Sequence, residues 1–260
     1  MPRFRPSRRG ATLRLATAVA AVLLFVPVTG AARADPEAEA LYTATTIVTG
    51  RDAVPAPILA GCLVTVLVKV SGDPRLADDP AAARIAGDAA RFVVRTGYRD
   101  RMAGIPVHDE QGTRERPHDL TVGFDAEAVD AALAALGRRP WPLPRPVLAV
   151  RLDVTAGGAA YTLTADGRRG RDMREALAAT ADRFGLPVEL VGGDGPVAER
   201  PVLGGTLAWS DAELGWTATW RLDGAGRTVR WSVRAAGFDA AFRSGVGGAA
   251  QVLSGNGRPG

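Results

Sequence analysis

Both histidines of this 260-residue chain lie in one polar segment, residues 107–119. The candidate metal ligands in this segment are His108, Asp109, Glu110, His118 and Asp119. Imidazole nitrogens and carboxylate oxygens together suit a transition metal such as zinc. Their spacing matches no established ligand motif, so a metal centre is the less favoured of two interpretations.

The second interpretation is a solvated surface of ion pairs, the usual state of a loop so rich in both charges. Charged loops carry binding functions more often than buried cores do. The sequence therefore favours this segment as the interaction surface of the first half of the chain. The residues assigned to that surface are His108, Asp109, Glu110, Arg114 and Arg116.

No other segment carries a catalytic signature, so no catalytic residue is assigned and no cofactor is predicted. The serines lack the Gly-x-Ser-x-Gly turn of hydrolases. The glycines at 192–195 and 204–205 lack the lysine of a phosphate loop and the spacing of a dinucleotide site, which indicates turns. The single cysteine, Cys62, lies in an apolar run and is predicted to be buried and unreactive.

Residues 1–34 have the pattern of a secretory leader. Arginines open the segment, an apolar run of 14 residues follows at 15–28, and the small residues Ala32 and Ala34 stand at its end. A spanning helix needs roughly 20 apolar residues, so cleavage after Ala34 is predicted in place of a retained membrane span. An ordinary signal is favoured over a twin-arginine signal because Ala11 stands where the latter carries a large apolar residue.

The charge of the chain depends on that leader. The whole chain has a formal charge of +4, but six arginines and no acid lie in residues 1–34. The remainder carries 26 basic and 28 acidic residues, a formal charge of −2. A nucleic-acid partner is therefore not expected, because such proteins need a basic surface on the mature domain.

The segment at 140–146 divides the rest of the chain, because prolines alternate there around Trp141 and make it stiff and extended. It is either a linker or a strap packed across a domain. The expected organisation is an α/β (α+β) fold of two small lobes with mixed sheets, at 35–139 and 147–244. A Gly-rich tail at 245–260 is expected to fray.

Hydrophobic periodicity and capping residues predict the elements of both lobes. Three helices are predicted after the caps Asp79, Asp125 and Asp172, and they end at Gly97, Gly137 and Gly185. The apolar run at 58–70 is either a buried helix or a buried strand, and its length favours the helix. The predicted strands are 41–48, 118–124, 147–154, 159–164 and 186–191. The helix at 172–184 with its flanking strands forms a strand–helix–strand element.

A Trp-rich hairpin is predicted at 216–233, turning at residues 223–226. Pairing Leu222 with Arg227 sets Trp220 opposite Val229 and Ala218 opposite Trp231. The rings then share one face of the sheet, which indicates core residues and not a ligand platform.

Several phrases together resemble a bacterial envelope family known as domain of unknown function 2066. The phrases lie at 66–73, 98–102, 108–114, 119–125, 141–146 and 216–220, and the resemblance runs from about 41 to 255. That family implies an exported location and supplies no catalytic residue. The element order after Arg145 is similar to small periplasmic α/β modules of envelope assembly proteins, which bind other proteins.

The sequence therefore favours a soluble, exported cell-envelope protein without catalytic activity, a protein-interaction or envelope-assembly module. Its expected partner is another envelope protein or a cell-wall component. The alternative is an exported enzyme, assisted by a metal ion held in the 108–119 loop. Whether the chain is an enzyme stays open at this point.

Overall fold

A computed structural model describes Met1 and residues 35–51, 53–104, 116–192, 197, 199–224, 226–235 and 237–259. Residues 34–260 form one compact unit, and the buried side chains of both halves join in one hydrophobic core. None of the described helices combines the length and apolarity needed to cross a membrane.

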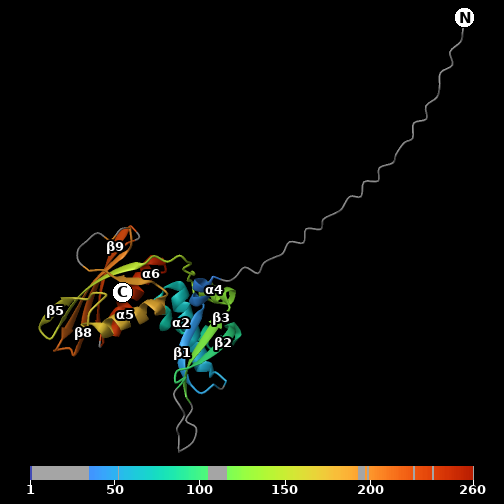
Figure 1. Cartoon of the computed structure of the whole chain (residues 1–260), viewed down its shortest axis with the longest axis horizontal. Helices are drawn as coiled ribbons and strands as arrows, with labels where there is room; N and C mark the ends of the chain where they lie inside the picture. Colours follow the sequence, from blue (N-terminus) through green and yellow to red (C-terminus); the bar gives the residue numbers. More distant parts are fainter. Residues whose placement is uncertain are drawn as a thin grey trace, which may run out of the picture. The chain divides into compact units, whose positions relative to one another are not determined.

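The first half builds an antiparallel sheet of three strands in the order β1-β3-β2, covered by helices (Figure 1). Its elements are α1 (Pro36–Leu41), β1 (Thr43–Thr49), α2 (Ala56–Ser71), η1 (Pro74–Ala77), α3 (Pro80–Ala86), η2 (Ala89–Phe92), β2 (Val93–Asp100), β3 (Pro117–Phe124) and α4 (Ala126–Ala135). The long helix α2 packs against β1, β3 and the other helices, because its residues are apolar on almost every side.

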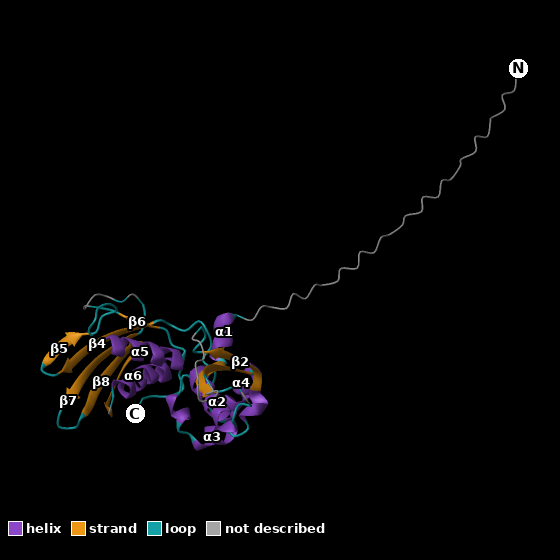
Figure 2. Ribbon diagram, turned by 60° about the horizontal axis from the view of Figure 1, so that its bottom comes forward, coloured by secondary structure: helices purple, strands orange, loops and turns teal. Residues whose placement is uncertain are grey.

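The second half builds a larger sheet in the order β5-β4-β7-β8-β9, with β6 on the same edge of β4 as β5. Its elements are β4 (Leu148–Ala156), β5 (Ala159–Thr162), α5 (Arg171–Phe184), β6 (Val188–Leu190), β7 (Val202–Ser210), β8 (Gly215–Gly224), β9 (Arg227–Ala235) and α6 (Phe238–Leu253). The pairs β4–β6 and β4–β7 are parallel, and the other pairs are antiparallel. Helices α5 and α6 lie together across one face of this sheet (Figure 2).

The predicted α+β class with mixed pairing is confirmed. The apolar run at 58–70 is the helix α2, which ends at Gly72 in the left-handed conformation with φ +69°. The predicted passage from strand to helix at 124–126 is also confirmed, since the Asp125 carboxylate accepts a hydrogen bond from the Ala128 amide at 2.8 Å. Cys62 is buried, as predicted.

The helix predicted over 79–97 is wrong after its first two turns. Asp79 caps α3 as expected, but α3 ends at Ala86, and residues 93–100 form the strand β2. The segment contains the β-branched residues Val93, Val94 and Thr96, and its backbone groups pair with β3. Pairing with a neighbouring strand overrides the helical pattern that the sequence shows.

The predicted start of α5 is shifted. Gly170, at φ +73°, holds the cap position, and the helix begins at Arg171. Asp172 therefore lies in the first turn and does not cap the helix. Its negative charge there interacts favourably with the positive N-terminal end of the helix dipole. The predicted end at Gly185 is confirmed, in the left-handed conformation.

Two predictions for Gly-rich segments are wrong. Residues 204–205 do not form a turn, and the segment after 245 is not a frayed tail. Gly204 and Gly205 lie inside β7, and residues 245–253 form the buried second half of α6. A Cβ atom on Gly245 would stand 2.7 Å from the Trp220 ring, and one on Gly248 would stand 2.7 Å from the Trp231 ring. These glycines let α6 approach the sheet, so packing overrides their low helix propensity.

The tryptophan hairpin forms with a register that differs by two residues from the prediction. Gly224 lies opposite Arg227, and Trp220 lies opposite Trp231. A shift of two keeps every side chain on its face, so the rings are core residues as predicted. The two large rings fit because the glycines of β7 and α6 leave room for them.

Candidate functional site

Four residues of the predicted interaction surface, His108, Asp109, Glu110 and Arg114, lie outside the described residues. Their neighbours Arg116, His118 and Asp119 are described and stand where β3 begins.

His118 faces the core side of β3 and is buried. Its Nδ1 atom lies 2.8 Å from the Arg116 carbonyl oxygen, and its ring lies edge-on to Tyr98 with 6.3 Å between the ring centres. Asp119 follows directly in the strand, so its side chain points to the opposite face. The imidazole and this carboxylate therefore do not converge on a common point.

Asp119 takes part in ion pairs across the β2–β3 hairpin. Its carboxylate lies 2.6 Å from Arg99 and 3.6 Å from Arg101. Arg116 lies 3.3 Å from the Asp100 carboxylate on the neighbouring strand. The described residues contain no group of three His, Cys, Asp or Glu side chains that could hold a metal ion.

The most strongly connected carboxylate of the described chain is Asp73, just after α2. Its side chain is completely buried and accepts hydrogen bonds from Arg75 at 2.8 and 2.9 Å, from Arg138 at 2.5 Å and from Gln251 at 3.0 Å. Burial opposes ionisation, but the bonds from Arg75 and Arg138 outweigh it and hold the pKa of Asp73 below its usual value. Because Gln251 comes from α6, this cluster ties the two halves together.

Arg145 makes a second connection between the halves. Its guanidinium is buried and stacks on the Trp141 ring, 4.4 Å from the ring centre. Its nitrogens donate to the carbonyl oxygens of Val70 at 3.2 Å, Phe184 at 2.8 Å and Gly185 at 3.1 Å, and to that of Trp141 at 2.7 Å. Val70 is in the last turn of α2 and Phe184 ends α5, so the cation lies at the negative ends of two helices.

Burial lowers the pKa of Arg145 to about 10. The guanidinium therefore stays charged at neutral pH, where its nitrogens bind carbonyl oxygens and its plane lies over the Trp141 ring. Asp73 and Arg145 use their polar atoms within the fold, and neither is exposed to a ligand. We call residues 73, 75, 138, 145 and 251 the junction cluster.

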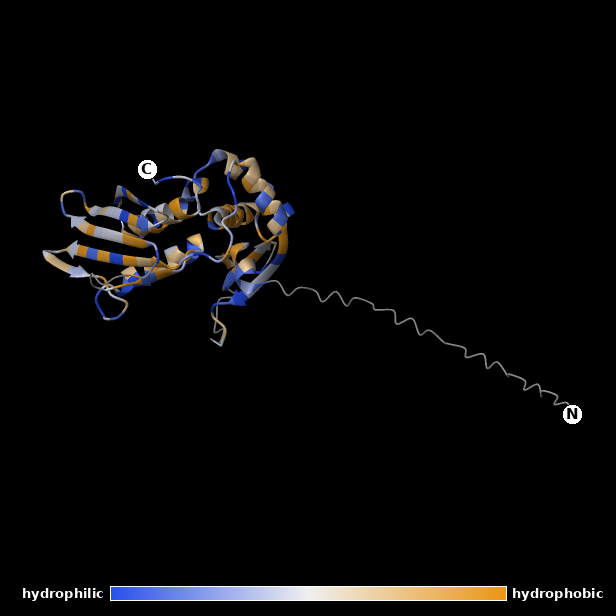
Figure 3. Cartoon of the chain, turned by 90° about the horizontal axis from the view of Figure 1, so that it is seen from above, coloured by the Kyte–Doolittle hydropathy of each residue, from blue (hydrophilic) through white to orange (hydrophobic). Residues whose placement is uncertain are grey.

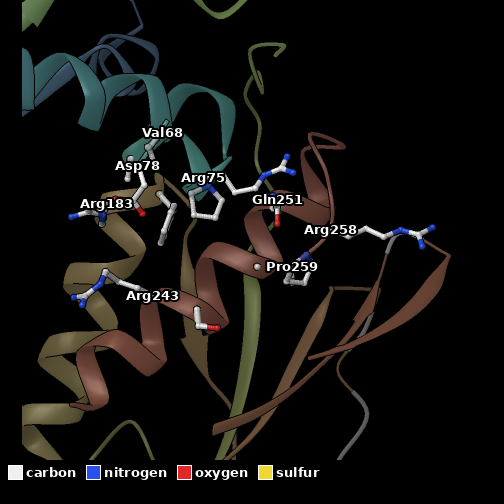
Figure 4. A pocket seen from close by; sticks show the side chains of 13 residues that line it. Val68, Arg75, Asp78, Arg183, Arg243, Gln251, Arg258 and Pro259 are labelled. Carbon is white, nitrogen blue, oxygen red and sulfur yellow. The ribbon is translucent and has the colours of Figure 1, made fainter. Parts of the chain in front are cut away.

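Next to the junction cluster is a cleft of about 410 Å³, formed by η1, α2, α5, α6 and the segment after α6 (Figure 4). Its apolar lining includes Val68, Pro74, Phe184 and Pro259. Arg75, Arg183, Arg243 and Arg258 also line it, together with Asp78. We call this site the arginine cleft.

The arginines of the cleft stand at two ends. In Figure 4, Arg183 of α5 and Arg243 of α6 stand at one end of the cleft, and Arg75 and Arg258 lie towards the other. Arg75 is paired with Asp73. Arg183, Arg243 and Arg258 have no ion pair or side-chain hydrogen bond to any residue that the structure describes. Asp78 is the single acid of the lining.

An anionic group is the ligand that this arrangement suits. Guanidinium groups form bidentate hydrogen bonds with carboxylate and phosphate groups, and the apolar side chains of the lining lie in the same cleft. The compact part of the chain is slightly acidic overall, with a formal charge of −2 for residues 35–260. The three arginines without an ion pair therefore make the cleft positively charged although the compact part of the chain as a whole is not.

No pattern in the sequence indicates this cleft. Successive arginines of the cleft are separated by about 60 positions or more in the sequence, apart from the pair Arg243 and Arg258. Each of them has the sequence context of an ordinary exposed residue in a helix or tail. Arg145 did carry a signal, since a single charge between prolines in a strap next to Trp141 is an unusual place for an arginine.

Part of the chain matches a described protein family. Residues 36–142 match the family described as "Domain of unknown function (DUF8605)". The expected resemblance to a family of unknown function is confirmed at that level. No curated protein matches the chain.

Two solved structures resemble parts of the chain weakly. One is an uncharacterized protein at 13% identity and a TM-score of 0.23, covering 45% of this chain and 92% of its own. The other is a protein from Xanthomonas campestris of the family DUF330, at 16% identity and a TM-score of 0.21, covering 44% of this chain and 85% of its own.

Proposed function

We propose that this chain is an exported, non-catalytic binding protein of the cell envelope, and that its arginine cleft holds an anionic group of a partner protein or a cell-wall component. The observation that carries the proposal is that Arg183, Arg243 and Arg258 line one cleft and form no ion pair with any described residue. Arg183 and Arg243 stand at the same end of the cleft, and an anion bound there would offset the repulsion between their charges.

Export is supported by the arginine-rich start, the 14-residue apolar run and the small residues before position 35. The resemblance to the envelope family numbered 2066 agrees with that location. N-terminal sequencing of protein recovered from the envelope fraction tests it. A product that begins at Asp35 supports the proposal, and a cytosolic product that keeps Met1 contradicts it.

Calorimetric titration of the purified chain with inorganic phosphate and with citrate tests the cleft. Saturable binding is expected, and Arg183→Gln with Arg243→Gln should weaken it about tenfold or more, since each charged hydrogen bond contributes about 1.5–3 kcal/mol. Arg171→Gln is the matched control, because Arg171 is an exposed arginine of α5 outside the cleft.

Equal loss in the cleft variant and in Arg171→Gln would mean that only net charge attracts the anions. Absence of saturable binding by either anion would contradict the proposal for the cleft. The sequencing result is independent of both outcomes.

A further inference from the structure

Strand β1 is an edge of the three-stranded sheet, with β3 on one side of it and no described strand on the other (Figure 1). The Tyr42 carbonyl accepts a hydrogen bond from the Phe124 amide at 2.9 Å, and the Gly50 amide donates to the Arg116 carbonyl at 3.1 Å. Bonded pairs alternate along an antiparallel ladder, so the even-numbered residues of β1 bond β3. The amides and carbonyls of its odd-numbered residues therefore point away from β3.

The free part of this edge is the stretch 45–49. At Thr43 the carbonyl oxygen accepts a hydrogen bond from the Lys69 ammonium at 2.8 Å, which occupies the start of the strand. The outward amides and carbonyls of Thr45, Ile47 and Thr49 bond no residue that the structure describes. They form a row of alternating donors and acceptors, which is the template on which a further strand pairs.

Ile47 stands at the centre of that stretch and is 57% exposed. Thr45 and Thr49, two positions to either side, are exposed on the same face, while Ala44 lies on the opposite, buried face. The strand is seven residues long and contains no charged residue. A long, uncharged edge with an exposed isoleucine favours pairing with another chain.

The other described edge strands carry features that oppose such pairing. β2 has a register shift between Val93 and Arg95 and the further charges of Arg99 and Asp100. Hydrophobic and hydrophilic residues alternate along the strands of the larger sheet (Figure 3), and its edge strand β9 carries three arginines. At the opposite edge, β5 and β6 are only four and three residues long. Bulges, charges and short strands are the usual protection of an edge, and β1 has none of them.

We infer that β1 is a dimer interface, where it pairs antiparallel with β1 of a second copy around a two-fold axis at Ile47. The outward residues are Thr, Ile and Thr in either direction of the strand. This register therefore sets Ile47 opposite Ile47 and Thr45 opposite Thr49. Cross-strand pairs of β-branched residues and of threonines stabilise a sheet. The same residues contribute from both copies, as a two-fold interface requires.

Charge also favours a second copy as the occupant of this edge. Antiparallel pairing brings the end of β1 in one copy to the start of β1 in the other. Arg51 follows that end, and α1, with Glu37 and Glu39 and no basic residue, precedes that start. Opposite charges thus meet at both ends of the interface, and no like charges meet within it.

The pairing joins two three-stranded sheets into one, with the protected strand β2 at each end. The assembly therefore closes at two copies and does not extend into a fibre. One strand from each copy buries less than the roughly 1,200–2,000 Å² of a stable interface. We expect a weak dimer, with a Kd on the order of 100 µM.

Sedimentation velocity of the purified chain from about 1 µM to about 1 mM tests this inference, and a monomer–dimer equilibrium is expected. Ile47→Lys should raise the dimer Kd about tenfold or more, because it sets two like charges opposite each other at the axis. Val94→Lys is the matched control, since Val94 is a β-branched residue of β2 that is 62% exposed at the other edge of the sheet. It should change the Kd less than about twofold.

Ile47→Cys tests the register independently. The Cα atoms of a bonded antiparallel pair lie about 5.5 Å apart, within the range of a disulfide. Oxidised glutathione should therefore convert Ile47→Cys to a covalent dimer and leave Val94→Cys monomeric. Cys62 is present in both variants and is buried.

Thermal melts establish that each variant is folded, and the cross-link remains informative if Ile47→Lys does not fold. The inference is overturned if the chain stays monomeric up to about 1 mM, if Ile47→Lys dimerises like the original chain, or if Val94→Lys loses as much. Failure of Ile47→Cys to cross-link would also overturn it, as would capture of an extended peptide by a chain that stays monomeric. Arg183→Gln in the arginine cleft should leave the dimer unchanged, so the result is independent of the proposed function.

Discussion

The junction cluster and the arginine cleft lie side by side, and both are built around arginine. In the junction cluster, Arg145 donates hydrogen bonds to carbonyl oxygens at the ends of two helices, and Arg138 donates to the buried Asp73 carboxylate. In the cleft, Arg183 and Arg243 are exposed and form no ion pair with a described residue. The same side chain therefore stabilises the fold in one place and is available to a ligand in the other.

Replacing Arg145 should have the largest effect on stability. Arg145→Met leaves the carbonyls of Val70 and Phe184 without this donor, and we expect a loss of about 3 kcal/mol or more in the free energy of unfolding. Urea unfolding measures it. Arg145→Lys, which keeps the charge but not the planar fork, should recover only part of the stability. A loss under about 0.5 kcal/mol, as at an ordinary surface site, would contradict the role given to Arg145.

Asp73→Asn should destabilise the chain by about 2–3 kcal/mol at neutral pH, because Arg75 and Arg138 lose their charged acceptor. The pKa of Asp73 is lower in the folded chain than its usual value of 3.8. Its ionised form therefore stabilises the fold above that value, and this stability is lost as the pH falls below about 4. Thermal melts between pH 2 and 7 should show a smaller acid-induced loss for Asp73→Asn than for the original chain. Identical pH profiles would refute the assignment.

Two glycines of helices differ in the space that surrounds them. A Cβ atom on Gly245 would meet the Trp220 ring at 2.7 Å, whereas one on Gly61, in α2, would have no neighbour within 4 Å. Gly245→Ala should cost about 1–3 kcal/mol through overpacking. Gly61→Ala should raise the stability by up to about 1 kcal/mol through helix propensity. Thermal melts compare the two, and a stabilising Gly245→Ala would show that α6 does not lie so close to the sheet.

The smallest effect on stability is expected in the cleft. Arg183→Gln and Arg243→Gln should each change the free energy of unfolding by less than about 0.5 kcal/mol, as exposed residues without partners do. Urea unfolding alongside the phosphate titration separates the two regions. A cleft variant that is destabilised as much as Arg145→Met would remove the distinction between them.

Local signals were sufficient for much of the fold. The apolar length of α2, the Asp125 cap of α4 and the alternation in β4, β8 and β9 are all encoded within single elements. The missed features depend on partners distant in the sequence. Strand β2 needs β3, and the glycines of β7 and α6 are explained only by the tryptophans that they contact.

The candidate sites were harder to predict for the same reason. The arginine cleft joins residues from positions 68 to 259, so no short motif contains it. The sequence directed attention to the 107–119 segment because its charges are adjacent in the chain. Of the residues described there, His118 and Asp119 point to opposite faces of β3.

The position of Arg145 has a consequence for how the chain can be divided. The segment that matches DUF8605 ends at residue 142, three positions before the guanidinium that binds the end of α2. A fragment that ends at that boundary would lack two hydrogen-bond donors. Arg145 would no longer donate to the Val70 carbonyl, and Gln251 would no longer donate to the Asp73 carboxylate. Recombinant fragments bounded by the family match would therefore expose polar atoms to solvent that are buried in the intact chain. Expression trials should begin with residues 35–260.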